Sequence, residues 1–103
     1  MMKLTVLYSP PAQVEEFDTH YLGVHLPLAA ELPDLVRAET SVVVATPDGS
    51  PAPYHRIAEL YWADAATMNA SLGSEQGRRT AQDAFEIAGR TGSTVTMLVS
   101  QVD

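Results

Sequence analysis

The chain contains no cysteine, and this absence removes several kinds of chemistry at once. Disulfide bonds, thiolate nucleophiles and cysteine-ligated zinc or iron–sulfur sites are all excluded. The fold must be held by noncovalent contacts, and 46% hydrophobic residues against 18% charged ones give the composition of a chain that folds around a core. With 103 residues, we expect one domain that spans residues 1–103.

Positive charge is also scarce. Six Lys and Arg against 13 Asp and Glu give a formal net charge of -7, and the basic residues are scattered along the chain. Such a chain repels phosphate backbones, so nucleic acid is not an expected partner. A phosphate-binding glycine loop and a serine nucleophile elbow are missing as well, which disfavours nucleotide binding and serine hydrolysis.

A long hydrophobic run is absent too. The apolar run from Leu4 to Tyr8 is interrupted by Ser9, Pro10 and Pro11, and it is too short for a signal-peptide core or a bilayer span. We therefore expect a cytoplasmic location and no contact with a membrane.

Hydrophobic periodicity predicts four strands and two helical regions. Alternation of apolar and polar residues predicts strands at residues 2–8, 35–45, 54–62 and 94–102. Apolar residues three and four apart predict helices at 13–32 and 64–88, the second broken and recapped at Gly73-Ser74. Two strand–helix–strand units predict a ferredoxin-like βαββαβ arrangement, an α+β fold whose antiparallel four-stranded sheet has both helices on one face.

The sheet face opposite the helices needs a cover of its own. We expect it to carry the apolar side chains of Leu7, Val42, Val44, Leu60, Trp62 and Leu98. A patch of this size is rarely left in water. We therefore expect a homodimer whose sheets pack face to face.

The most suggestive functional residue is His25, which lies at the edge of the apolar stripe of the first helix. Pro27 lacks the N–H that would bond the carbonyl of Gly23, so we expect the helix to kink or loosen around His25. A titratable residue on a distorted turn beside an apolar layer suits ligand binding and proton transfer. The alternative is a partly buried histidine that bonds a backbone carbonyl.

The spacing of neighbouring polar residues limits what His25 can contact. His20 lies five residues away, about 140° around a helix, so we expect no shared metal site. A Glu16–His20 pair would lie at the surface, and Asp18 lies about 10.5 Å from His25 along the axis. A partner for His25 should therefore come from the sheet. Glu59 would pair with His25 if it faces the helices, and would be merely solvated if it faces away.

Aromatic side chains offer the other groups for a ligand pocket. Hydroxyl groups near His25 could orient a carbonyl or a phenol. The alternative is that these side chains are ordinary core and interface aromatics. The candidate ligand-binding residues are Tyr8, Tyr21, Leu28, Tyr61 and Trp62.

The sequence resembles the EthD-domain family, and the resemblance rests first on the predicted helix at 13–32. The family's signature there corresponds to Phe17-Asp18-x-x-Tyr21-x-x-x-His25-Leu26-Pro27-Leu28-Ala29. Similar stretches cover nearly the whole chain, namely Met2-Lys3-Leu4-Thr5-Val6-Leu7-Tyr8, Asp48-Gly49-Ser50, Ala58-Glu59-Leu60-Tyr61-Trp62 and Val95-Thr96-Met97-Leu98-Val99. The chain has Tyr61-Trp62 where the family has an aromatic pair of varied identity.

The resemblance implies a ferredoxin-like dimeric α+β barrel in which His25 is the functional position. Similar small proteins act as polyketide cyclases, monooxygenases, lactone isomerases and dehydratases, often without a metal or prosthetic group, so we expect no cofactor here. Fold analogy does not transfer a substrate.

Three hypotheses of function follow. In the first, His25 acts as general acid or base on a small apolar carbonyl, phenolic or polyketide-like compound, with Tyr21, Tyr61 or Glu59 positioning the ligand. In the second, the protein binds a metabolite without catalysis, as an accessory protein to a partner oxygenase. In the third, it is a dimerisation module whose pocket is filled by its own side chains.

Overall fold

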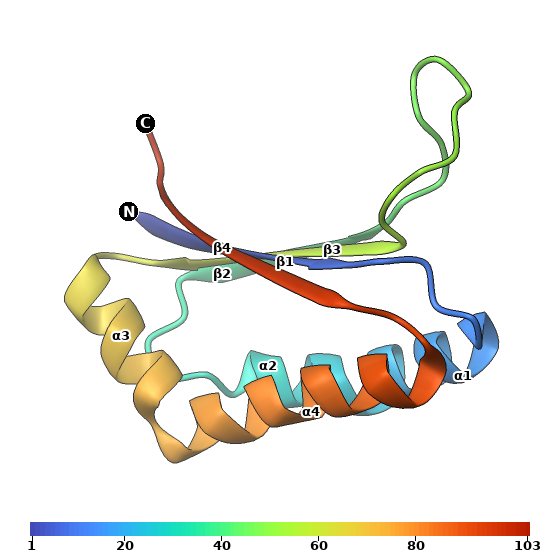
Figure 1. Ribbon diagram of the computed structural model, residues 1–103. Coiled ribbons are helices and arrows are strands. Elements are labelled where there is room, and N and C mark those ends of the chain that lie inside the picture. Colours follow the sequence, from blue (N-terminus) through green and yellow to red (C-terminus); the bar gives the residue numbers. More distant parts are fainter.

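The computed structural model describes residues 1–103, and its helices and strands follow the predicted order (Figure 1). The strands are β1 (Met2–Tyr8), β2 (Arg37–Val42), β3 (Arg56–Trp62) and β4 (Val95–Gln101). The helices are α1 (Val14–His20), the π-helix η1 (Tyr21–His25), α2 (Leu26–Ala30), α3 (Ala65–Gly73) and α4 (Glu75–Thr91).

The four strands form one antiparallel sheet in the order β2-β3-β1-β4, which places β1 and β3 at its centre. In this register Val6 of β1 lies between Ala58 of β3 and Met97 of β4. Figure 1 shows α1, α2 and α4 on one side of the sheet, while the other side carries no helix. The predicted ferredoxin-like α+β fold, with its helices on one face, is confirmed.

The hydrophobic core lies between the sheet and the helices. Leu4, Val6 and Tyr8 of β1 point into it and meet Phe17 and Tyr21 of the first helical region. Because side chains alternate along a strand, these residues share one sheet face with the even-numbered residues of β3. The core thus has one sheet wall and one helical wall, and the candidate site is built between them.

The face assignment of two large residues was wrong. Leu60 and Trp62 belong to the helix-facing core, where they are 6% and 0% exposed. The indole nitrogen of Trp62 donates to the carbonyl of Pro33 at 3.1 Å. The prediction mixed residues of both strand parities, and alternation permits only one parity on each face.

Two further residues were misassigned to the open face, and two were placed correctly. Val42 lies opposite Arg56, whose side chain reaches α1, so Val42 belongs to the helix side. Val44 follows β2 in the loop and is 90% exposed. Leu7 and Leu98 do share the open face, together with polar residues that the prediction left out, namely Lys3, Thr5, Glu39 and Glu59. That face is therefore more polar than predicted.

The breaks between the helices follow from local chemistry. Asp64 caps α3 by accepting from the backbone N–H of Thr67 at 2.8 Å, and Ser74 caps α4 by accepting from that of Gly77 at 3.1 Å. The α4 helix continues past the predicted end to Thr91, and the φ of 78° at Gly92, the next residue, suits a left-handed cap. Phe85 on α4 is 56% exposed. None of the helices combines the length and the apolar character that crossing a membrane would take.

Candidate functional site

The helix loosens at the predicted place. Residues Tyr21–His25 form a π-helix, in which the N–H of Leu26 bonds the carbonyl of Tyr21 five residues earlier. Pro27 follows directly and has no N–H to continue a regular α-helical ladder. Single turns of π-helix occur frequently at functional sites, and this one carries His25 at its end.

His25 is buried, at 6% exposure, between a tyrosine and a carboxylate. Its Nδ1 lies 2.9 Å from Oδ2 of Asp83 on α4, and its Nε2 lies 3.3 Å from the hydroxyl of Tyr8 on β1. The His25 ring also stacks on the Tyr21 ring, with centroids 5.6 Å apart. Three elements therefore fix the imidazole in one orientation.

The surroundings decide the protonation of His25. Burial lowers the pKa of His25 below its ordinary value, and the hydrogen bond to Asp83 offsets this only in part. A neutral imidazole has one N–H, and a carboxylate can only accept, so that N–H lies on Nδ1 and points at Asp83. Nε2 is then an unprotonated base that accepts from Tyr8. Burial raises the pKa of Tyr8, so its hydroxyl remains a donor.

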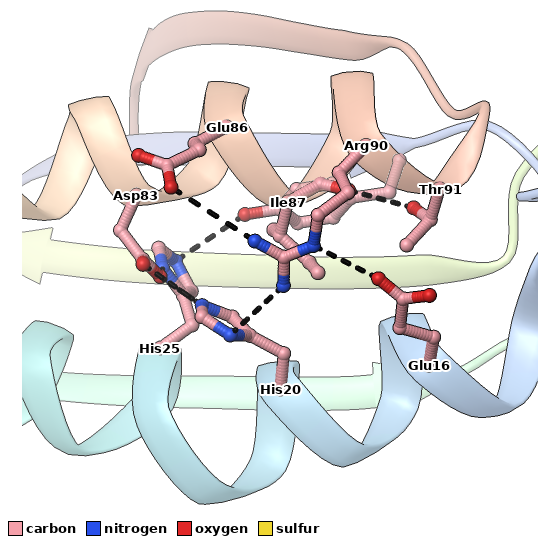
Figure 2. Close-up of polar contacts among 9 residues, drawn as sticks. Glu16, His20, His25, Asp83, Glu86, Ile87, Arg90 and Thr91 are labelled. Atoms are coloured by element: carbon pink, nitrogen blue, oxygen red, sulfur yellow. Dashed lines mark hydrogen bonds and ion pairs between the residues drawn. The ribbon is translucent and has the colours of Figure 1, made fainter.

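His20 reaches the same carboxylate, as Figure 2 shows. Its Nε2 lies 2.8 Å from Oδ1 and 3.0 Å from Oδ2 of Asp83. His20 and His25 are therefore not on different sides of the helix, as the α-helical angle of about 140° predicted, because a π-helix brings residues that are five apart close to one face. The surface pair of Glu16 with His20 is not formed either, since Glu16 bonds Arg90 at 2.8 Å.

A cavity of about 360 Å³ lies between the sheet and the helices, and His25 and Tyr8 line it. This volume is within the range of small-ligand pockets. Fourteen of the 18 lining residues are hydrophobic, and no Asp, Glu, Lys or Arg is among them. The lining extends across the sheet from Thr40 on β2 to Met97 on β4. The cavity therefore presents the Tyr8–His25 pair to an interior that is mostly apolar and whose other polar side chains are Thr40 and Thr80.

Glu59 and Tyr61 do not lie near His25. Both project from the open face of the sheet, where Glu59 accepts from Lys3 at 3.2 Å and from the Tyr61 hydroxyl at 3.3 Å. Arg37 lies over the Tyr61 ring, 4.3 Å from its centroid. The alternative in which Glu59 pairs with His25 is thus not realised, because odd-numbered residues of β3 point away from the helices.

The other candidate ligand-binding residues do not line the cavity. Tyr21 packs behind His25, fully buried, and its hydroxyl has no hydrogen-bond partner; burial raises the pKa of Tyr21 to about 12. Trp62 is core, and Leu28 borders a shallow polar depression beside Asp83. Of the predicted site residues, only His25 and Tyr8 line the cavity.

Sequence reasoning missed Asp83, because it sought a partner for His25 in the sheet. A signal was present: Asp83 lies three residues after Thr80 and four before Ile87, both buried on α4. An acidic residue at that spacing on an inward stripe needs a partner. Asp83 lies 58 residues from His25 along the chain, so no local sequence pattern indicated that the two side chains pair.

No group of His, Asp and Glu side chains is arranged to hold a metal ion. In the one place where two histidines and a carboxylate meet, nitrogens of both imidazoles are directed at Asp83. The cluster is thus a hydrogen-bonded one.

Comparison with known proteins gives the family. The family model described as the EthD domain matches residues 9–89. An uncharacterized 11.0 kDa protein from the thcB-thcC intergenic region of Rhodococcus erythropolis is 31% identical over 98 residues, which cover 95% of this chain and 91% of that protein.

Solved structures agree on the fold. An ethyl tert-butyl ether D (EthD) family protein from Bacillus halodurans C-125 has a TM-score of 0.91 and 26% identity, covering 100% of this chain and 99% of the other. SnoaB, a cofactor-independent oxygenase from Streptomyces nogalater, has a TM-score of 0.66 and 13% identity, covering 99% and 92% of the two chains, and shows likeness of fold alone. The family match, the relative and the fold lead to one conclusion: the chain belongs to the EthD family.

Proposed function

We propose that this EthD-family protein is an enzyme in which His25 acts as a general base on a small apolar carbonyl or phenolic compound. The observation that carries the proposal is the arrangement of one imidazole between Asp83 and the cavity. The Nδ1–H of His25 donates to Asp83 at 2.9 Å, while Nε2 remains an acceptor beside the cavity. An oriented, unprotonated imidazole beside an apolar pocket is the arrangement that proton abstraction requires.

The composition of the cavity supports this ligand class. A phosphate or carboxylate group would find no Lys or Arg among the lining residues, and burying an unpaired charge is costly. A neutral ring compound would instead contact aliphatic side chains such as Leu4, Leu60 and Met97. Its one polar group would then lie at the Tyr8–His25 pair.

The proposed step moves one proton. Nε2 of His25 takes the proton from the carbon beside the carbonyl, and the electron pair moves to the carbonyl oxygen; with a phenol it takes the O–H proton, and the electron pair stays on the phenolic oxygen. The Tyr8 hydroxyl, which burial keeps protonated, turns from Nε2 to donate to that oxygen. Asp83 stabilises the imidazolium that forms, and the proton then returns to the product.

Exchange of carbon-bound hydrogen for deuterium tests the step without knowledge of the natural substrate. We would incubate the purified protein with 2-tetralone in D₂O and follow the hydrogens beside the carbonyl by NMR. The wild-type protein should accelerate exchange over buffer, and His25→Gln should lose about 10²- to 10⁴-fold of that acceleration. His55→Gln is the matched control, because His55 lies outside the cavity lining.

Two results would contradict the proposal. If His25→Gln exchanges 2-tetralone as fast as the wild type, His25 is not the base. If 2-tetralone shifts the amide resonances of the cavity residues without any exchange above buffer, the protein is a binder, as in the alternative of an accessory protein to a partner oxygenase.

We propose further that the protein is a homodimer that pairs through the open sheet face. Leu98 on that face is 53% exposed, and no helix of the chain covers it. Light scattering at micromolar concentration should give twice the mass of 11.1 kDa; a monomer would contradict the proposal. The cytoplasmic location expected from the sequence stays a prediction.

A further inference from the structure

Asp83 holds two imidazoles with one carboxylate. Nδ1 of His25 and Nε2 of His20 lie 2.9 and 3.0 Å from the same Oδ2 atom, and His20 also lies 2.8 Å from Oδ1. Figure 2 shows both rings directed at Asp83 from the helical region that runs along α4. An N–H on each ring can donate to this carboxylate. The two imidazoles therefore share the one negative charge of Asp83.

No permanent cation pairs with this carboxylate. The salt bridges of Asp83 are those with the two histidines. Arg90 on the same helix is held by Glu16 at 2.8 Å and lies 3.9 Å from Glu86. The guanidinium reaches the pair only through a long contact of 3.5 Å to Nδ1 of His20.

Besides Arg90, the titratable groups near the pair are two tyrosines, one arginine and one glutamate. Tyr8 and Tyr21 face His25, and burial raises the pKa of each hydroxyl, so both are neutral. Arg79 and Glu86 border the shallow depression beside Asp83. Of these groups, only the two imidazoles lie within hydrogen-bonding distance of the Asp83 carboxylate.

Two rings on one carboxylate oppose each other's protonation. A proton on His20 neutralises Asp83 and places a like charge near His25. Burial is the largest cause that lowers the pKa of His25, and the charge of His20 lowers it further, against the two contributions of Asp83 that raise it. Two imidazoles that share one carboxylate are therefore linked through it.

We propose that His20 is a positioning residue for His25: it competes for the Asp83 carboxylate, so that a proton taken up by either imidazole opposes a proton on the other. This inference rests on the proposed function, since it concerns the same base. A carboxylate that bonds a lone histidine fixes its tautomer and also makes it easier to protonate. His20 separates these two effects, because Asp83 still orients His25 while its charge is partly engaged elsewhere.

The consequence is that Nε2 of His25 stays unprotonated in mild acid, and so stays available as a base. As the pH falls, uptake of a proton by His20 delays protonation of His25. Nε2 of His25 then remains free beside the cavity over a wider pH range than a lone histidine–aspartate pair would allow.

A titration by NMR tests the proposal and requires no substrate. The ring resonances of His25 are followed against pH in the wild type and in His20→Gln, whose amide can still donate to Asp83 but cannot take a proton. We expect a broadened, non-ideal curve in the wild type. In His20→Gln we expect a single step, with its midpoint higher by roughly half a pH unit or more.

A second variant and a control make the result decisive. His20→Lys supplies a fixed positive charge and should lower the midpoint of His25, while His55→Gln should leave it unchanged. Equal midpoints for His25 in the wild type, His20→Gln and His20→Lys would overturn the proposal. A role for His20 in packing alone predicts that equality. Failure of 2-tetralone exchange would instead overturn the proposed function and leave this titration interpretable.

Discussion

Two histidine–aspartate clusters flank the first helical region, and they differ in what balances the carboxylate. Between α1 and the start of β3, Asp18 accepts from His55 at 2.8 Å and from Arg56 at 3.1 Å. On the side of α4, Asp83 is shared by His20 of α1 and His25 of η1 alone. Only the second cluster places a residue in the lining of the cavity.

The guanidinium of Arg56, which only the Asp18 cluster contains, accounts for the difference in chemistry between the two clusters. Burial alone would raise the pKa of Asp18, but the hydrogen bonds from His55 and Arg56 together outweigh it and hold that pKa below its ordinary value. Arg56 stays charged at any physiological pH, so the Asp18 cluster is balanced without a proton on His55. We interpret it as a clamp that holds α1 against β3, whereas the Asp83 cluster can gain and lose a proton.

The largest expected difference between the two clusters is in the rate of 2-tetralone exchange after each aspartate is neutralised in turn. Asp83→Asn removes the acceptor that fixes the His25 tautomer, so 2-tetralone exchange should fall by about 10²-fold or more. Asp18→Asn should keep exchange within about twofold of the wild type, because Asp18 contacts neither His25 nor the cavity. Equal losses of 2-tetralone exchange in Asp83→Asn and Asp18→Asn would contradict a difference in role between the two clusters.

The clamp should matter more for stability than for exchange. His55→Gln removes the contact of the ring with Asp18, and urea unfolding should show a loss of about 1 kcal/mol. Exchange of 2-tetralone by the folded variant should be unchanged. A loss of exchange without a loss of stability would place His55 in the site and contradict its interpretation as a clamp.

The smallest effect expected is on the pH dependence of stability. Because burial lowers the pKa of His25 in the folded state, the unfolded chain binds the proton more readily. Stability from this residue is complete above the ordinary histidine pKa of about 6.5 and is lost as the pH falls through the folded value. Urea unfolding at several pH values should show a weaker decline in His25→Gln than in the wild type; parallel curves would contradict the lowered pKa.

Local patterns were sufficient to predict the fold. The alternation from Met2 to Tyr8 predicted β1 with both of its bounds, and Asp64 and Ser74 predicted the starts of α3 and α4. Each of these signals lies within a few residues of the element it determines, where propensity and capping act. The distorted turn around His25 was predicted from Pro27 for the same reason.

The partners of His25 depend on tertiary packing, and the sequence did not reveal them. Asp83 approaches across the interface of η1 with α4, which no local pattern specifies. The π-helix then brought His20 to the same side, against the α-helical angle that had separated the two residues. Glu59 was a reasonable alternative until the register placed it opposite Thr5, on the open face.

The tautomer of His25 tests the account most directly, because the proposed base requires an Nδ1–H bonded to Asp83 and an unprotonated Nε2. Nitrogen-15 NMR of the ring, recorded above pH 7, distinguishes the two nitrogens. We expect a protonated Nδ1 and a free Nε2 in the wild type, and a loss of this preference in Asp83→Asn. A proton on Nε2 in the wild-type protein would contradict the account, since His25 could not then accept a proton from a ligand in the cavity.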